Sequence, residues 1–180
     1  MAAIRTSLGE EADYYGVTQE RVDAAIARNV NMLQNASDME LTTAGATLNV
    51  RVINQTGHKL PTGYPEGRRM WLNIKFFDSN DKLVDELGGY DFKRAQADLE
   101  GTKVWEAIHG IDAAVAAATG LPAGPSTRLA LANTKLKDNR IPPRGYSAAA
   151  FAAVGAPVIG ASYNDGQYWD DTPFAIPEGA

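Results

Sequence analysis

The hydrophobic period of this sequence changes near residue 47, and that change constrains its fold class most strongly. Residues 18–35 carry apolar side chains every three or four positions, which is the period of an amphipathic helix. The apolar positions are Val22, Ile26, Val30 and Leu33, with Thr18 as the expected N-cap. From Thr47 the apolar residues alternate with polar ones, which is the period of a half-buried strand. We therefore expect an N-terminal helical segment, residues 1–40, and a strand-based domain, residues 41–180.

The rest of the chain extends this mainly β pattern. Strands are expected at about 47–53, 70–78, 82–86, 102–108 and 127–137. Short helices are expected at 112–118 and 147–153, while the tail from residue 163 has no clear period. The expected fold is a mainly β, antiparallel, immunoglobulin-like β-sandwich with an N-terminal helix and short helical insertions. We expect a further strand beyond residue 180, so a partner chain or a second copy would add a strand at the C-terminal edge.

Charge and composition exclude several classes of protein. The net charge of −5, with Lys and Arg scattered, argues against nucleic acid as a partner. No run of about 18 apolar residues is present to span a membrane. No export signal is evident at the N-terminus. The sequence contains no cysteine, which excludes disulfides, iron–sulfur clusters and covalent attachment of haem to this sequence.

The most distinctive part of the sequence is residues 54–71, which we call the glycine–proline segment. Its three glycines and two prolines predict an irregular, stiff connection between two strands. Such a connection can hold His58 in a fixed orientation, as a metal ligand or as a distal ligand to haem iron. In the alternative interpretation His58 only bonds to carbonyls within the loop. Arg68 and Arg69 would pair with a haem propionate or form surface ion pairs.

Metal sites of other kinds are weaker candidates. His109 is the only other histidine, and it would need His58 and carboxylates to complete a site such as that of a metal-dependent hydrolase. Asp165, Asp170 and Asp171 in the tail supply hard oxygen ligands for Ca²⁺, although solvated turns also explain them.

The tryptophans suggest a different function. Trp71 and Trp105 alternate with the expected core residues of their strands, so they should lie on the opposite face. That face is either a second packed surface or an exposed patch. With Trp169 they would form a stacking platform for sugars, as in a carbohydrate-binding β-sandwich module.

Three segments carry a resemblance to a known family. They are the glycine–proline segment, Asp138-Asn139-Arg140-Ile141-Pro142-Pro143-Arg144-Gly145-Tyr146 and Asp165-Gly166-Gln167-Tyr168-Trp169-Asp170-Asp171-Thr172. The sequence from about residue 25 to residue 180 is similar to the haem-free C-terminal β-domain of bacterial multihaem c-type cytochromes. The most specific pieces are Gly-His-Lys-Leu-Pro-Thr-Gly-Tyr-Pro and Asn-Arg-Ile-Pro-Pro-Arg-Gly.

This resemblance implies a non-catalytic structural or interaction module of an electron-transfer assembly. It implies a periplasmic or extracellular location and a multihaem c-type cytochrome chain or domain as the partner. Haem c would come from that partner or from a segment outside this sequence, and His58, Arg68 and Arg69 would contact it. The carbohydrate-binding module and the metal-dependent hydrolase remain the competing hypotheses.

Overall fold

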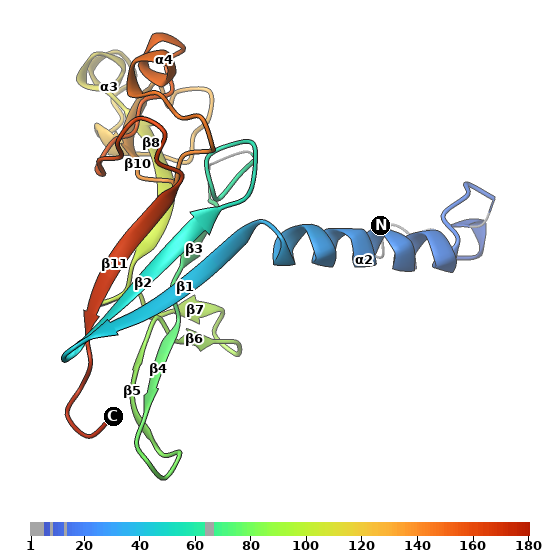
Figure 1. Cartoon of the computed structure of the whole chain (residues 1–180). Coiled ribbons are helices and arrows are strands. Elements are labelled where there is room, and N and C mark those ends of the chain that lie inside the picture. Colours follow the sequence, from blue (N-terminus) through green and yellow to red (C-terminus); the bar gives the residue numbers. More distant parts are fainter. Residues whose placement is uncertain (1–5, 8, 13, 64–66) are drawn as a thin grey trace. The chain divides into compact units, whose positions relative to one another are not determined.

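The computed structural model describes residues 6–7, 9–12, 14–63 and 67–180. The chain divides into two compact units, Met1–Ser37 and Asp38–Ala180 (Figure 1). None of the helices in the described residues is long and apolar enough to cross a membrane.

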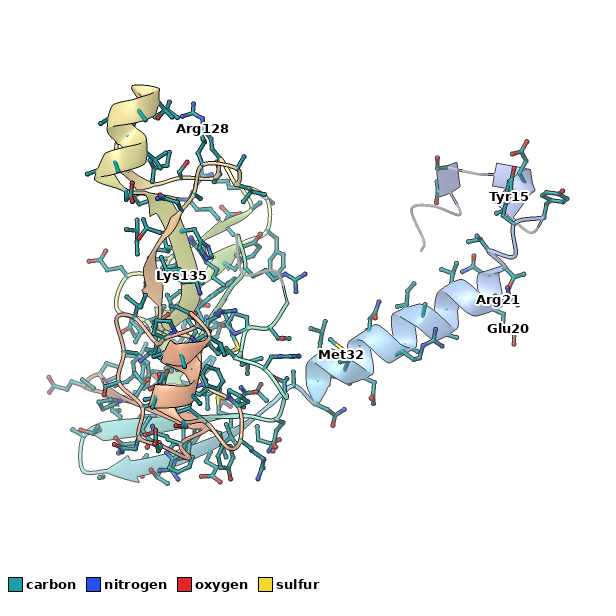
Figure 2. All side chains as sticks on the ribbon, turned by 90° about the horizontal axis from the view of Figure 1, so that it is seen from above. Tyr15, Glu20, Arg21, Met32, Arg128 and Lys135 are labelled. Atoms are coloured by element: carbon teal, nitrogen blue, oxygen red, sulfur yellow. The ribbon has the colours of Figure 1, made fainter. Side chains whose placement is uncertain are left out.

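The first unit contains a short 3-10 helix, η1 (Gly9–Ala12), and the helix α2 (Gln19–Gln34). The predicted N-cap is confirmed, because the side chain of Thr18 accepts a hydrogen bond from the backbone N–H of Arg21. The Arg21 guanidinium donates to the carbonyl of Gly16 at 2.9 Å and ties the start of α2 to the preceding turn. Figure 2 shows Glu20, Arg21 and Met32 along this helix.

Antiparallel sheets build the second unit. One sheet has the order β1 (Ser37–Ala44), β2 (Thr47–Asn54), β11 (Trp169–Ala175). The other has the order β10 (Thr134–Asp138), β8 (Val104–Ile111), β3 (Arg69–Trp71), with β9 (Gly124–Pro125) also pairing with β8. Two short pairs are β4 (Ile74–Phe77) with β5 (Leu83–Leu87) and β6 (Tyr90–Asp91) with β7 (Gln96–Ala97). The short helices are α3 (Ala113–Thr119) and α4 (Ala148–Ala153).

Buried side chains come from alternate positions of both larger sheets. Val50 and Val52 of β2 are buried, as the alternation predicts, and so are Trp105 and Ala107 of β8. Trp105 is 1 % exposed, and its indole donates to the carboxylate of Asp170 in β11 at 2.7 Å, which links the two sheets. The predicted mainly β, antiparallel fold with an N-terminal helix is confirmed.

The strand expected at 70–78 is divided between two partners. Up to Leu72 the chain pairs with β8, since the Leu72 N–H donates to the carbonyl of Lys103 at 3.1 Å. From Ile74 it pairs with β5 instead. Between the two partners, the Asn73 side chain donates to the carbonyl of Leu87. The predicted core face persists across the break, because Leu72 and Phe76 are both buried.

Strand prediction failed at two other places. The expected strand at 127–137 is confined to β10, because turn hydrogen bonds from Leu131 and Ala132 to the carbonyl of Arg128 close the chain on itself before it. In the tail, β11 pairs with β2 from Trp169 to Ala175. Its sequence Trp-Asp-Asp-Thr-Pro-Phe-Ala contains two acids and a proline, which hide the strand from pattern analysis.

Candidate functional site

Three segments distant in sequence meet beside the end of β2: residues 54–63, 138–146 and 163–170. We call them together the motif cluster, because they contain most of the residues that carry the family resemblance. Leu60 and Ile141 form a two-way backbone bridge, with N–H to carbonyl distances of 2.8 and 3.0 Å. The N–H of Asn54 donates to the carbonyl of Tyr168 at 2.8 Å. Residues 64–66 of the glycine–proline segment lie outside the described residues.

Asn54 is the polar centre of the motif cluster. Its side chain is fully buried, and its amide nitrogen lies 2.7 Å from the carbonyl of His58 and 3.0 Å from those of Ile141 and Pro142. The amide oxygen accepts from the backbone N–H of Thr56 at 2.8 Å. The primary amide supplies two donors and an acceptor at one position, so one side chain joins the loop at 54–58 to the proline pair.

A buried group of charges holds the next part of the loop. Lys59 is 6 % exposed, and its ammonium bonds to Asp138 at 2.8 Å and to the carbonyls of Ala156 and Pro157 at 2.9 Å. Asp138 is 1 % exposed and receives a bidentate pair of bonds from Arg140, at 2.7 and 2.9 Å. All three ammonium donors and both carboxylate oxygens are used, which is the condition for burying such charges at tolerable cost.

Burial and pairing act in opposite directions on these groups. Burial lowers the pKa of Lys59, while its hydrogen bond to Asp138 works against that change. Burial by itself would raise the pKa of Asp138, but the bonds from Arg140 and Lys59 outweigh it and hold this pKa below its usual value. Asp138 therefore stays ionised at neutral pH and is the counter-charge of two cations.

A second buried carboxylate joins the motif cluster to the sheets. Asp170 is 7 % exposed, and one of its oxygens accepts from Trp105, from the Tyr163 hydroxyl at 2.8 Å and from Lys103 at 2.9 Å. Burial and the nearby carboxylate raise the pKa of Tyr163 strongly. The phenol thus remains a neutral donor, which suits a position between an aspartate and the carbonyl of Asn139.

At the surface, the motif cluster presents His58. Its backbone carbonyl is bound by Asn54, whereas its side chain is exposed. Arg144, also exposed, donates to the side chain of Gln55 at 2.9 Å and lies over the ring of Tyr168 at 4.2 Å. Two further arginines bond to loop carbonyls: Arg68 to Thr62 at 2.9 Å and Arg140 to Pro61 at 3.5 Å. The loop around His58 is therefore surrounded by cations.

The other histidine and Arg69 lie on β strands away from this loop. Arg69 in β3 forms an ion pair with Glu106 of β8 at 3.3 Å. His109 is half-buried in β8 opposite Lys135 of β10. In the described ranges, no three His, Asp or Glu side chains gather in a group that could hold a metal.

The three aspartates proposed for Ca²⁺ have separate positions. Asp165 accepts from the N–H of Ala148 at the start of α4. Asp170 is the buried acceptor described above. Asp171 is exposed and forms a bidentate pair with Arg51, at 2.7 and 3.0 Å. Since Asp170 and Asp171 are neighbours in a strand, they point to opposite faces of the sheet.

The tryptophans correct one expectation from the sequence. Trp105 faces the core, so it does not belong to an exposed platform. Trp169 is half-buried, with the guanidinium of Arg51 5.2 Å from its ring. Trp71 lies beside Tyr90 and Phe92, two aromatic residues that pattern analysis missed because a two-residue strand and a turn have no readable period. Lys59 and Asp138 were missed for the same reason.

Comparison with known proteins gives little beyond similarity. No family model and no curated protein matches this sequence. Among solved structures, the chain is similar to a penta-heme cytochrome c552 from Thermochromatium tepidum, with a TM-score of 0.47 and 19% sequence identity. The likeness covers 83% of this chain and 30% of that cytochrome chain.

Proposed function

We propose that this chain is a haem-free interaction module of an extracytoplasmic multihaem-cytochrome assembly, and that the loop bearing His58 is its docking element. The module has no catalytic role of its own and takes no covalent haem. Its task is to present a fixed side chain to a haem carried by another polypeptide or by a segment outside this sequence.

The observation that supports this proposal most is how the His58 loop is anchored. Asn54 binds the backbone carbonyl of His58 from inside, and the adjacent Lys59 is fixed by the ion pair with Asp138. A loop held on both sides of one residue loses little further conformational entropy on binding. The side chain between these anchors is exposed, which is the arrangement expected of a presented ligand and not of a histidine that only stabilises a turn.

The donor set fits a haem held by a partner. One neutral imidazole supplies one axial nitrogen to haem iron, and thioether attachment is absent because the sequence has no cysteine. Arg68 and Arg144 are exposed, and each uses only part of its guanidinium within the loop. Their remaining N–H groups suit the carboxylates of haem propionates. When bound, haem would supply the redox chemistry, while these residues bind and orient it.

The test is recovery of haem with the tagged full-length protein from its own cells. The eluate would be assayed for c-type haem by its pyridine haemochrome spectrum. We expect stoichiometric haem with the native sequence and at least about tenfold less retention with His58→Ala, a factor that corresponds to about 1.4 kcal/mol of binding.

A matched control comes from the second histidine. His109→Ala removes an imidazole from β8, outside the loop, and should retain haem like the native sequence. Urea unfolding of the His58→Ala protein should match the native midpoint, because the side chain is exposed. An eluate without c-type haem, or equal retention by His58→Ala and the native sequence, would overturn the proposal.

A further inference from the structure

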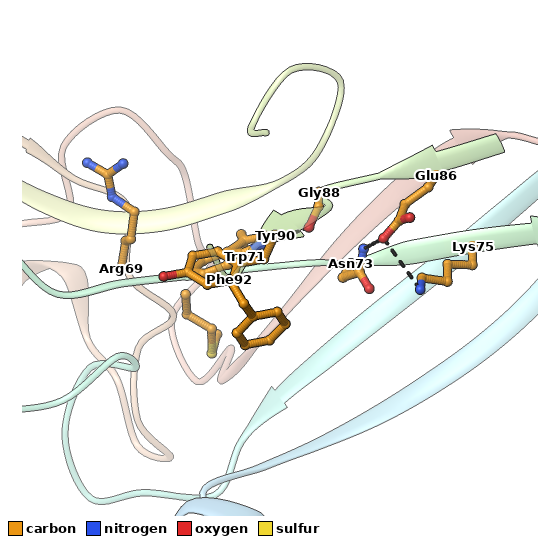
Figure 3. Close-up of a pocket in the computed structure, with 9 residues that line it drawn as sticks. Arg69, Trp71, Asn73, Lys75, Glu86, Gly88, Tyr90 and Phe92 are labelled. Atoms are coloured by element: carbon orange, nitrogen blue, oxygen red, sulfur yellow. Dashed lines mark hydrogen bonds and ion pairs between the residues drawn. The ribbon is translucent and has the colours of Figure 1, made fainter. Parts of the chain in front are cut away.

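An aromatic groove lies beside the junction of β3 and β4 (Figure 3). It encloses about 450 Å³, and we define it by three aromatic and three polar side chains. They are Trp71, Tyr90 and Phe92, together with Asn73, Lys75 and Glu86. Figure 3 shows the aromatic rings between Arg69 at one end and the three polar side chains at the other. The groove is therefore apolar in the middle and polar at both ends.

The aromatic rings form a stepped surface. The ring centroids of Trp71 and Tyr90 are 6.0 Å apart with planes tilted by 34°. Those of Tyr90 and Phe92 are 4.9 Å apart and meet edge to face. These are favourable aromatic geometries, so the three rings support one another without needing a covering layer.

Phe92 is unusual because it is 88 % exposed in an ordered turn. The side chain of Asp91 accepts from the N–H groups of Lys93 and Arg94, which fixes the turn that carries the ring. A phenyl ring exposed to this extent gains almost no burial energy within the chain. Its position is therefore better explained by contact with a ligand than by folding.

The indole of Trp71 is locked in place. Its N–H donates to the carbonyl of Gly88 at 3.0 Å. Gly88 has a positive φ of 71°, and a Cβ there would lie 2.0 Å from the carbonyl oxygen of Leu72 and 3.1 Å from the Trp71 ring. Only glycine allows this close approach, and the result is a preorganised aromatic wall.

The polar end combines donors with an acceptor. Asn73 donates to Glu86 at 2.8 Å, and the Lys75 ammonium lies 3.7 Å from the same carboxylate oxygen. An amide, a carboxylate and an ammonium side by side can donate to and accept from a ligand's hydroxyl groups. One carboxylate beside one ammonium also leaves this end near neutrality, which does not select a strongly charged ligand.

We propose that the aromatic groove binds a neutral oligosaccharide. A pyranose ring has an apolar face of C–H groups and a rim of hydroxyls that both donate and accept. The stepped rings match the face, while Asn73, Lys75 and Glu86 match the rim. A proline-rich peptide, the other common occupant of aromatic grooves, offers carbonyl acceptors but few donors and would leave Glu86 without a ligand.

The experiment uses the full chain and defined sugars. Cellohexaose, xylohexaose and chitohexaose would be titrated separately while the intrinsic tryptophan fluorescence is recorded. We expect saturable binding of at least one of them. Phe92→Ala and Trp71→Ala should each weaken it at least about tenfold, because each removes a stacking surface.

Controls separate the groove from general effects. Trp169→Phe changes a tryptophan outside the groove and should keep the native affinity. Phe92→Ala should keep the native unfolding midpoint, so lost binding is not lost folding. No saturable binding of any sugar, or native affinity in both groove variants, would overturn the proposal. Binding of a polyproline peptide in place of sugar, lost in the same variants, would overturn it in favour of a peptide site.

This inference is independent of the proposed cytochrome role. The variants that test it lie outside residues 54–63, so haem retention by Phe92→Ala should match the native sequence. Failure of sugar binding with haem retention intact would reject the groove proposal alone.

Discussion

The motif cluster and the aromatic groove use costly side chains in opposite ways. In the motif cluster, charges that normally lie in water are buried, and every described bonding group of Lys59 and Asp138 has a partner. In the aromatic groove, rings that normally lie in the core are exposed, and Phe92 contacts water over most of its surface. The first pattern fixes a loop, whereas the second leaves binding energy unused. Residues that are distinctive in sequence can therefore be structural, and inconspicuous ones can be functional.

Removing the central charge of the motif cluster should have the largest effect. Asp138→Ala leaves Lys59 and Arg140 buried beside one another without a counter-charge, which should cost about 3–5 kcal/mol of unfolding free energy. Urea denaturation measures it. Asp171→Ala, which breaks an exposed ion pair, is the matched control and should leave the midpoint near the native one. Equal effects of the two changes would mean that burial does not distinguish the motif cluster.

The groove's tight turn should come next. Gly88→Ala meets both a positive φ and the carbonyl of Leu72, so it should cost about 1–3 kcal/mol more than the strain of φ alone. Gly120→Ala is a close control, because Gly120 has the same φ of 71° with nothing within 4 Å of its Cβ position. Thermal unfolding of both variants gives the difference. Similar losses in the two would show that the close approach at Trp71 contributes nothing.

The link between the sheets should have a smaller but clear effect. Trp105→Phe removes the indole N–H from Asp170 and leaves Tyr163 and Lys103 as its partners. One lost hydrogen bond to a buried carboxylate should cost about 1–3 kcal/mol, measured by urea denaturation. Trp169→Phe, at a half-buried ring, should cost less. The opposite order would contradict the assignment of Trp105 to the core.

The depressed pKa of Asp138 gives a pH dependence with a defined sign. Its folded-state pKa lies below the ordinary value of 3.8, so its stabilisation is complete above that pH and is lost as the pH falls through the folded value. The change should be smaller than that of Asp138→Ala, because a protonated carboxyl still forms hydrogen bonds. Unfolding free energies measured between neutral pH and pH below 3.8 should fall less steeply in Asp138→Asn than in the native protein. Parallel curves would contradict the depressed pKa.

Phe92→Ala should have the smallest effect on stability and thereby sharpen the comparison. The ring is 88 % exposed, so its loss should change the unfolding free energy by less than about 0.5 kcal/mol. Thermal unfolding measures this. A loss of several times that amount would assign Phe92 a structural role and remove the contrast with the motif cluster.

Local patterns in the sequence were sufficient for some elements. The N-cap at Thr18, the alternation of β2 and the hairpin of β4 and β5 all depend on residues within a few positions of one another. The helix α3 was predicted for the same reason, with Asp112 as its N-cap and Gly120 after its end. The strand β11 was not, because its partner β2 lies more than a hundred residues earlier and its own sequence has weak strand propensity.

The candidate sites divide in the same way. The glycine–proline segment and its exposed His58 follow from the sequence, since stiff loops and rare residue types are visible there. The face of Trp105 does not, because the strand pattern alone has two sides and only pairing with β3 and β10 decides which is inward.

By itself, the sequence determined the order of helix and strands, the absence of covalent haem and the loop that carries His58. Only the tertiary structure decided that Lys59 and Asp138 form a buried pair and that Trp71, Tyr90 and Phe92 line one groove. The physical reason is that periodicity encodes a residue's environment within its own element. Charge pairing and aromatic stacking between elements depend instead on distances that the whole fold sets.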